Sequence, residues 1–138
     1  MEPLLPRLIR WGSASLLVAS FAVGFVACGS SEADPACVSG RDCICNGGSC
    51  DKTCEGGNCN FKCQGGATCT FHCPAGGCNV DCSAGSTCNT DCKAGGCNEA
   101  CAGAKSCKMA CDKNCVTSCG GAAVCETSCD EAAGCIKS

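Results

Sequence analysis

Residues 59–82 read CNFKCQGGATCTFHCPAGGCNVDC, and this stretch decides the fold. Its cysteines recur as Cys-x3-Cys pairs separated by short gaps rich in glycine. In a strand the first, third and fifth residues of such a pair share a face, so Cys59, Phe61 and Cys63 would point the same way. The two residues between them are polar. This alternation predicts β-strands, with glycines supplying the positive φ angles of the turns.

The glycine-rich gaps decide between strand and helix. Positions i and i+4 share a face in both structures, so the cysteine spacing alone allows either. A helix of fewer than about 12 residues is marginal in water. Gly65–Gly66 and Gly76–Gly77 interrupt the chain before that length is reached. We therefore predict one short strand for each Cys-x3-Cys pair.

The cysteines repeat with a period of 19 residues. Two series keep this spacing over four copies each: Cys50, Cys69, Cys88 and Cys107, and Cys54, Cys73, Cys92 and Cys111. A fixed period of this size indicates an array or solenoid. We predict an all-β, small, disulfide-rich repeat: a two-sided β-solenoid of four coils, each about 19 residues long. A meander of short disulfide-closed hairpins is the alternative.

One asparagine recurs per coil on the predicted outer face. The recurrence of Asn60, Asn79 and Asn98 favours the solenoid, and the expected role of these residues is amide stacking along the coils. The disulfide-filled coils resemble those of insect antifreeze solenoids, which carry regular Thr-x-Thr ranks. Outward threonines such as Thr53 and Thr70 are scattered here, so the chain lacks that pattern.

The cysteine that ends one strand and the cysteine that begins the next flank the same turn and face each other. This adjacency predicts nine disulfides: Cys54–Cys59, Cys63–Cys69, Cys73–Cys78, Cys82–Cys88, Cys92–Cys97, Cys101–Cys107, Cys111–Cys115, Cys119–Cys125 and Cys129–Cys135. Four cysteines remain for two further bridges in an N-terminal cap: Cys37, Cys43, Cys45 and Cys50. Only Cys28 is left over, which fits an exported chain with paired cysteines.

The first 27 residues have the composition of an export signal. Arg7 and Arg10 form a positive n-region, and residues 13–27 form an uncharged apolar stretch. This stretch has the length of a signal-peptide h-region and is short for a membrane-spanning helix. We therefore predict a signal peptide over residues 1–27.

The end of this segment, Phe25-Val26-Ala27-Cys28, resembles the lipobox of bacterial lipoproteins, with Phe25 at the position usually taken by leucine. The resemblance implies cleavage before Cys28, which becomes the lipidated N-terminus. Gly29 follows, and the absence of aspartate there implies sorting to the outer membrane. Residues 28–40 are expected to form the lipidated N-terminus and a flexible tether, and residues 41–138 the cysteine-rich repeat domain.

The composition of the mature chain excludes some functions. From Cys28 onward its net charge is −4, with no basic cluster of the kind that nucleic acids require. Its only aromatic residues are Phe61 and Phe71. These are too few for an ordinary hydrophobic core, so disulfides are expected to replace it.

Metal binding is the alternative function. The cysteine content resembles that of metallothioneins, but those proteins bunch their ligands as Cys-x-Cys, which occurs here once, at Cys43-Ile44-Cys45. Wide regular spacing and export favour disulfides over thiolate ligands. No metal ligand set and no cofactor are expected.

The ionisable residues do not form a catalytic motif. His72, the sole histidine, is expected to face outward, and Asp81 and Asp91 are expected on solvated faces. Two charged residues, Lys52 and Glu99, fall on inward positions of predicted strands. Lys52 lies near the end of the array and can extend outward. The alternation gives no reason for Glu99.

The sequence thus predicts a non-enzymatic lipoprotein of the bacterial cell envelope. It would be a structural or interaction module, held in the membrane by the lipid on Cys28, with an envelope or extracellular partner and no nucleic-acid partner.

Overall fold

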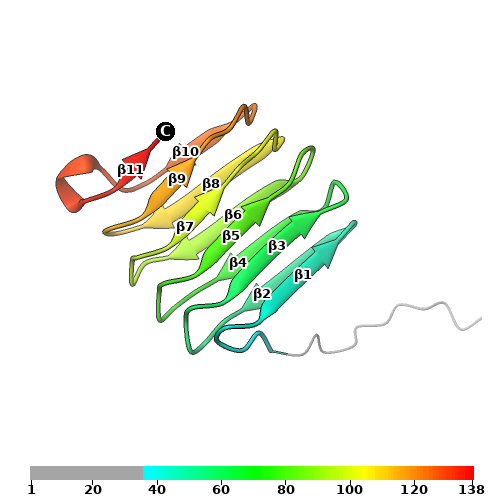
Figure 1. The fold of residues 1–138 in the computed structure, drawn as a ribbon, viewed down its shortest axis with the longest axis horizontal. Coiled ribbons are helices and arrows are strands. Elements are labelled where there is room, and N and C mark those ends of the chain that lie inside the picture. Colours follow the sequence, from blue (N-terminus) through cyan, green and yellow to red (C-terminus); the bar gives the residue numbers. More distant parts are fainter. Residues whose placement is uncertain (1–35) are drawn as a thin grey trace, which may run out of the picture. The chain divides into compact units, whose positions relative to one another are not determined.

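The computed structural model describes residues 36–138. The predicted signal peptide, Cys28 and the tether up to residue 35 lie outside the described residues. The described chain winds into a two-sheet parallel β-solenoid (Figure 1). Sheet A contains β1 (Asp42–Asn46), β3 (Asn60–Gln64), β5 (Asn79–Cys82), β7 (Asn98–Ala100), β9 (Val116–Ser118) and β11 (Ile136–Lys137). Sheet B contains β2 (Ser49–Thr53), β4 (Thr68–His72), β6 (Thr87–Cys92), β8 (Ser106–Cys111) and β10 (Cys125–Thr127).

The sheet topology confirms the solenoid. Strand order is β1-β3-β5-β7-β9-β11 in sheet A and β10-β8-β6-β4-β2 in sheet B, and every pairing is parallel. A hairpin would pair consecutive strands in an antiparallel ladder. No described strand pairs with its neighbour in sequence, so the hairpin meander is wrong.

The solenoid is longer than the four predicted coils, because the expected N-terminal cap is itself a coil. β1 lies in the segment predicted as a cap and pairs in register with β3. Cys43 lies beside Phe61, and Cys45 lies beside Cys63. Both cysteines are buried while Ile44 between them is exposed. The Cys-x-Cys spacing therefore serves strand alternation here.

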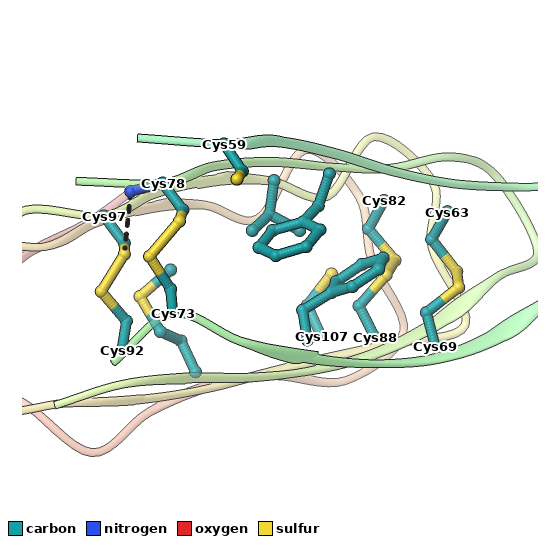
Figure 2. Close-up of a cluster of buried hydrophobic side chains, with 14 of the residues drawn as sticks. Cys59, Cys63, Cys69, Cys73, Cys78, Cys82, Cys88, Cys92, Cys97 and Cys107 are labelled. Atoms are coloured by element: carbon teal, nitrogen blue, oxygen red, sulfur yellow. Dashed lines mark hydrogen bonds between the residues drawn. A yellow bond between two sulfur atoms is a disulfide. The ribbon is translucent and has the colours of Figure 1, made fainter. Parts of the chain in front are cut away.

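Sulfur fills most of the space between the two sheets. Among residues 36–138, 24 hydrophobic residues are buried: 18 are cysteines, and the only ones with larger side chains are Phe61, Phe71, Val80 and Met109. The rings of Phe61 and Phe71 stack across the two sheets with centroids 4.5 Å apart. Disulfides line both margins of the interior (Figure 2). The core is thus a narrow layer that covalent bonds close at each turn.

Lys52 occupies the inward position of β2 at the N-terminal end. It lies in register with Phe71, and its side chain is half-buried. Partial burial lowers the pKa of Lys52, because desolvation disfavours the charged form. A charge directed into the first coil also discourages another strand from adding to that edge.

The turns stack as regularly as the strands. Gly76 and Gly77 both have positive φ, and the N–H of Gly77 donates to the carbonyl of Gly95 one coil further on, at 3.0 Å. A Cβ at Gly76 would collide with that same carbonyl oxygen. Glycine is therefore required at residue 76 both by backbone conformation and by the close approach of the next coil.

We expect Gly76→Ala to destabilise the protein more than Gly85→Ala. The φ angles are +77° and +76°, so alanine is strained by about 1–2 kcal/mol at either position. Only Gly76 has a neighbour within 4 Å of its added Cβ. We expect the free energy of unfolding to fall by about 3 kcal/mol for Gly76→Ala and about 1 kcal/mol for Gly85→Ala. Guanidinium unfolding followed by circular dichroism measures both, and equal losses would contradict the stacked-turn explanation.

Candidate functional site

The bridges are the chemically distinctive feature of this fold. The described part of the chain contains eleven disulfides, and each of the nine pairs predicted along the repeat is joined: Cys54–Cys59, Cys63–Cys69, Cys73–Cys78, Cys82–Cys88, Cys92–Cys97, Cys101–Cys107, Cys111–Cys115, Cys119–Cys125 and Cys129–Cys135. The four cysteines of the first coil form Cys37–Cys43 and Cys45–Cys50. Cys28 lies outside the described residues. Ten of these bridges close a turn between successive strands and so tie sheet A to sheet B, whereas Cys37–Cys43 joins the segment before β1 to β1 itself.

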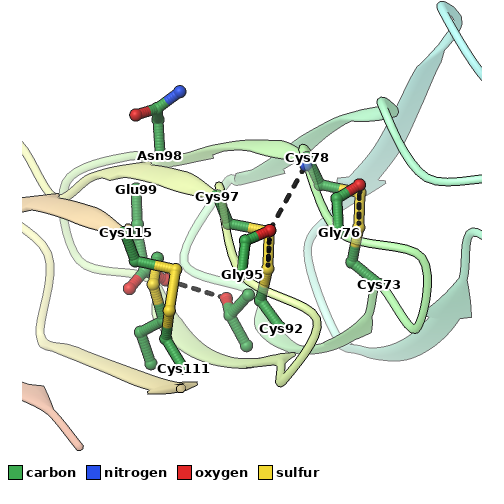
Figure 3. The surroundings of a disulfide bond; sticks show 12 residues. Cys73, Gly76, Cys78, Cys92, Gly95, Cys97, Asn98, Glu99, Cys111 and Cys115 are labelled. Atoms are coloured by element: carbon green, nitrogen blue, oxygen red, sulfur yellow. Dashed lines mark hydrogen bonds between the residues drawn. A yellow bond between two sulfur atoms is a disulfide. The ribbon is translucent and has the colours of Figure 1, made fainter. Parts of the chain in front are cut away.

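The bridges stack above one another at both margins of the solenoid. In Figure 3, Cys73–Cys78, Cys92–Cys97 and Cys111–Cys115 follow one another along one margin. Sulfurs of neighbouring bridges come close: the Sγ atoms of Cys73, Cys92 and Cys97 all lie within 4.8 Å of one another. Because a 19-residue coil advances the chain by one strand spacing, equivalent sulfurs must stack in this way.

Close sulfur atoms do not amount to a thiolate metal centre here. Every cysteine in residues 36–138 is in a disulfide. Thiolates, and not disulfide sulfurs, are the strong ligands of soft metals. Metallothionein-like binding would therefore require a reduced form of the chain.

A buried carboxylic acid lies inside the solenoid. Glu99 on β7 is 2% exposed and accepts a 2.9 Å hydrogen bond from the hydroxyl of Thr90 on β6 through its Oε1 atom. Its Oε2 atom has no hydrogen-bond partner among the described residues. Burial raises the pKa of Glu99 to about 7, although the bond from Thr90 acts in the opposite direction. Glu99 therefore has a protonation equilibrium near neutral pH.

The polar layer around Glu99 continues towards the C-terminus. Thr117 follows Glu99 in register in sheet A, and its hydroxyl accepts a 2.8 Å hydrogen bond from Thr127 of sheet B. The Thr117 hydroxyl also donates towards the sulfur of Met109, at 3.9 Å. In the C-terminal coils the polar side chains of the core thus hydrogen-bond to one another across the two sheets. The N-terminal coils carry stacked phenylalanines at the equivalent positions.

The asparagine column forms the expected ladder on the outer face of sheet A. The amide of Asn79 donates to Asn60 at 3.1 Å, and the amide of Asn98 donates to Asn79 at 3.2 Å. These bonds run along the solenoid and connect three successive coils. The ladder is consistent with a structural role for the column.

Sheet B carries a column of hydroxyl residues that sequence reasoning missed. Ser49, Thr68, Thr87 and Ser106 are in register on four successive strands, on the outer side of the sheet. The 19-residue spacing would have revealed them. The neighbouring outward column reads Asp51, Thr70, Asn89, Lys108 and Glu126. Its charges leave the face without the paired threonine ranks of an antifreeze solenoid.

His72, Asp81 and Asp91 do not gather at one site. His72 faces outward on β4, as expected, with its Nε2 atom 3.4 Å from Asp51. Asp81 lies on sheet A and Asp91 on sheet B, so the two carboxylates belong to opposite faces. This placement gives no acid–base pair between Asp81 and Asp91.

The class of this protein is defined by its fold and not by similarity to known proteins. No protein-family model, curated protein or solved structure matches this chain. Among residues 36–138 there is no helix with the length and hydrophobicity to cross a membrane.

The fold and its bridges define the class of protein. It is a cysteine-rich, disulfide-stapled parallel β-solenoid of about five turns, a structural module. Eleven disulfides indicate an oxidising, extracytoplasmic location.

Proposed function

We propose that this protein is a non-enzymatic lipoprotein of the bacterial cell envelope, in which the solenoid acts as a rigid structural or interaction module. The observation that carries the proposal is the pairing of every described cysteine, because a chain stapled in this way requires an oxidising compartment. The lipobox-like Phe25-Val26-Ala27-Cys28 supplies the means of attachment. The outer membrane is the proposed location, since Gly29 follows the lipidated cysteine.

The geometry suits a short-range presentation role. Ala36, the first described residue, comes eight positions after Cys28. A chain of that length spans at most about 29 Å when extended, so the solenoid would remain close to the lipid surface. Its outward side chains project from two sheets, on which the asparagine ladder and the hydroxyl column are fixed in register. Such faces fit an extended partner at the envelope better than a small substrate.

Cys28→Ser is expected to abolish both lipid attachment and membrane retention. Cells expressing the chain are labelled with a clickable fatty acid, and the labelled protein is followed through membrane fractionation. We expect label on the native chain and its complete loss in the variant, because the thiol that would form the thioether with the lipid is removed. Ser30→Ala, two residues away, is the matched control and should retain label. Label persisting in Cys28→Ser would contradict lipidation at this residue.

The thiol count separates this proposal from metal sequestration. The exported protein should have a non-reduced mass about 22 Da below that of the fully reduced chain, since each of eleven bridges removes two hydrogens. An alkylating reagent should then find no free thiol from residue 36 onward. A protein isolated with alkylatable cysteines after chelator treatment would instead support the metallothionein-like alternative.

A further inference from the structure

The last coil places a partly exposed disulfide against a buried one. Cys129–Cys135 lies next to Cys111–Cys115, with the Sγ atoms of Cys111 and Cys135 4.0 Å apart. The Sγ atoms of Cys111, Cys129 and Cys135 all lie within 4.8 Å of one another. Cys129 is half-buried, whereas Cys111, Cys115 and Cys135 are buried. A thiol from solvent can therefore reach this group of sulfurs through Cys129.

A backbone amide is directed at the sulfur that such an attack would release. The N–H of Cys115 donates to the Sγ atom of Cys135 at 3.3 Å. Burial by itself raises the pKa of a thiol, because it disfavours the thiolate. A hydrogen bond to the sulfur acts in the opposite direction and makes Cys135 a better leaving group. The same bond orders Cys135 beside the neighbouring bridge.

We propose that these four cysteines form a thiol–disulfide exchange site whose co-reactant is a dithiol. A thiolate of the dithiol attacks the Sγ atom of Cys129, the Cys129–Cys135 bond breaks, and Cys135 leaves as a thiolate. The second thiol of the reagent then displaces Cys129 as a thiolate, and the reagent departs as its own disulfide. Two electrons have passed from the dithiol to the protein.

The second stage is an exchange within the protein. The Cys135 thiolate attacks the Sγ atom of Cys111, a bond forms between Cys111 and Cys135, and the Cys111–Cys115 bond breaks. Cys115 takes up the electron pair as a thiolate and is then protonated by solvent. The product carries thiols at Cys115 and Cys129 and a new disulfide between Cys111 and Cys135. Reduction at the exposed bridge thus opens the buried one, while the last coil stays covalently attached.

The interior of the solenoid contains the same arrangement without access. The Sγ atoms of Cys73, Cys92 and Cys97 form an equivalent group, and the N–H of Cys78 donates to Cys97 at 3.3 Å (Figure 3). All four of these cysteines have 0% exposure. The exchange is therefore confined to the C-terminal coil, because a reductant in solution can reach Cys129 but not the four interior cysteines. The interior group therefore serves as the control for the C-terminal group in the experiments.

Limited reduction followed by disulfide mapping tests the site. The oxidised solenoid is treated with dithiothreitol until about two thiols per molecule appear, and is then quenched with N-ethylmaleimide in acid. Cleavage after lysine and glutamate separates Met109–Lys113, Asn114–Glu126, Thr127–Glu131 and Ala132–Lys137. We expect maleimide on Cys115 and Cys129, and a cross-link between Met109–Lys113 and Ala132–Lys137. The interior bridges should remain closed.

Two outcomes of this mapping would overturn the proposal. One is maleimide on Cys129 and Cys135 with the Cys111–Cys115 bridge intact, which means reduction without exchange. The other is earlier opening of Cys45–Cys50 or Cys119–Cys125, which also contain half-buried cysteines.

A variant tests the exchange without any reductant. Cys129→Ser leaves Cys135 as a free thiol beside Cys111, and at pH 8 the Cys111–Cys135 bridge should form with Cys115 released. Cys92→Ser frees Cys97 beside Cys73 in the same geometry, and exchange there should give Cys73–Cys97. A Cys129→Ser protein that keeps only Cys111–Cys115 would overturn the proposal. Circular dichroism on each variant establishes that the sheets are retained.

Discussion

Complete reduction of the eleven disulfides is expected to unfold this protein. Each bridge closes a short loop of 4 to 6 residues in sequence separation and contributes roughly 2 kcal/mol by the chain-entropy estimate. The total, on the order of 20 kcal/mol, exceeds the usual net stability of a folded domain. Within residues 36–138, six of the 24 buried hydrophobic residues are not cysteine, and two of those are alanines. The interior therefore lacks the apolar surface to hold two sheets together once the sulfurs are free.

The measurement is far-ultraviolet circular dichroism before and after reduction and alkylation. We expect the β-sheet signal and any cooperative thermal transition to disappear. Removing the reductant under oxidising conditions, before alkylation, is the control that separates reversible unfolding from aggregation. A reduced, alkylated chain that keeps its sheet signal and a cooperative transition would show that the strand ladders suffice by themselves.

The second large effect is a loss of stability as the pH rises from about 4.5 to about 7, caused by Glu99. Its pKa is raised to about 7 in the fold by burial, against an ordinary value of 4.5. The folded state thus holds the proton more tightly than the unfolded chain. The stabilisation is complete below about pH 4.5 and is lost progressively up to about pH 7. A difference of this size corresponds to about 3 kcal/mol.

Glu99→Gln isolates this contribution. The amide keeps the shape of the protonated acid, and it can still accept the hydrogen bond from Thr90. We expect the free energy of guanidinium unfolding to fall by about 3 kcal/mol between pH 4.5 and pH 8 in the native chain and by much less in the variant. Glu55→Gln, at an exposed turn, should behave like the native chain. The same pH dependence in Glu99→Gln and in the native chain would place its origin elsewhere.

Much of the fold could be predicted because the repeat is short and its signals are local. The alternation in Cys59-Asn60-Phe61-Lys62-Cys63 decides which side chains point inward, since successive residues of a strand face opposite ways. The same local geometry places Cys63 and Cys69 at either end of one turn. The strand β1 was not predicted, because the four cysteines of the first coil were assigned to a cap that includes Cys43-Ile44-Cys45. Its spacing differs from Cys-x3-Cys but obeys the same alternation.

The candidate sites were harder to predict because they join residues from different coils. The hydroxyl column on sheet B joins Thr68 and Thr87 from successive coils, so it follows from the 19-residue spacing and not from the alternation within either strand. The approach of Cys135 to Cys111, 24 positions apart, depends on how the last coil stacks on the one before it. Neither contact follows from alternation within one strand.

The sequence by itself determined the strands, the inward and outward sides, the turn positions and the cysteines that face each other across each turn. These properties depend on φ preferences and on side-chain direction over a few residues. Only the tertiary structure decided that the strands pair in parallel with the coil before and after, and that Thr90 reaches Glu99 across the core. Contacts of this kind depend on the winding of the whole chain, because residues far apart in sequence meet only when successive coils stack in register.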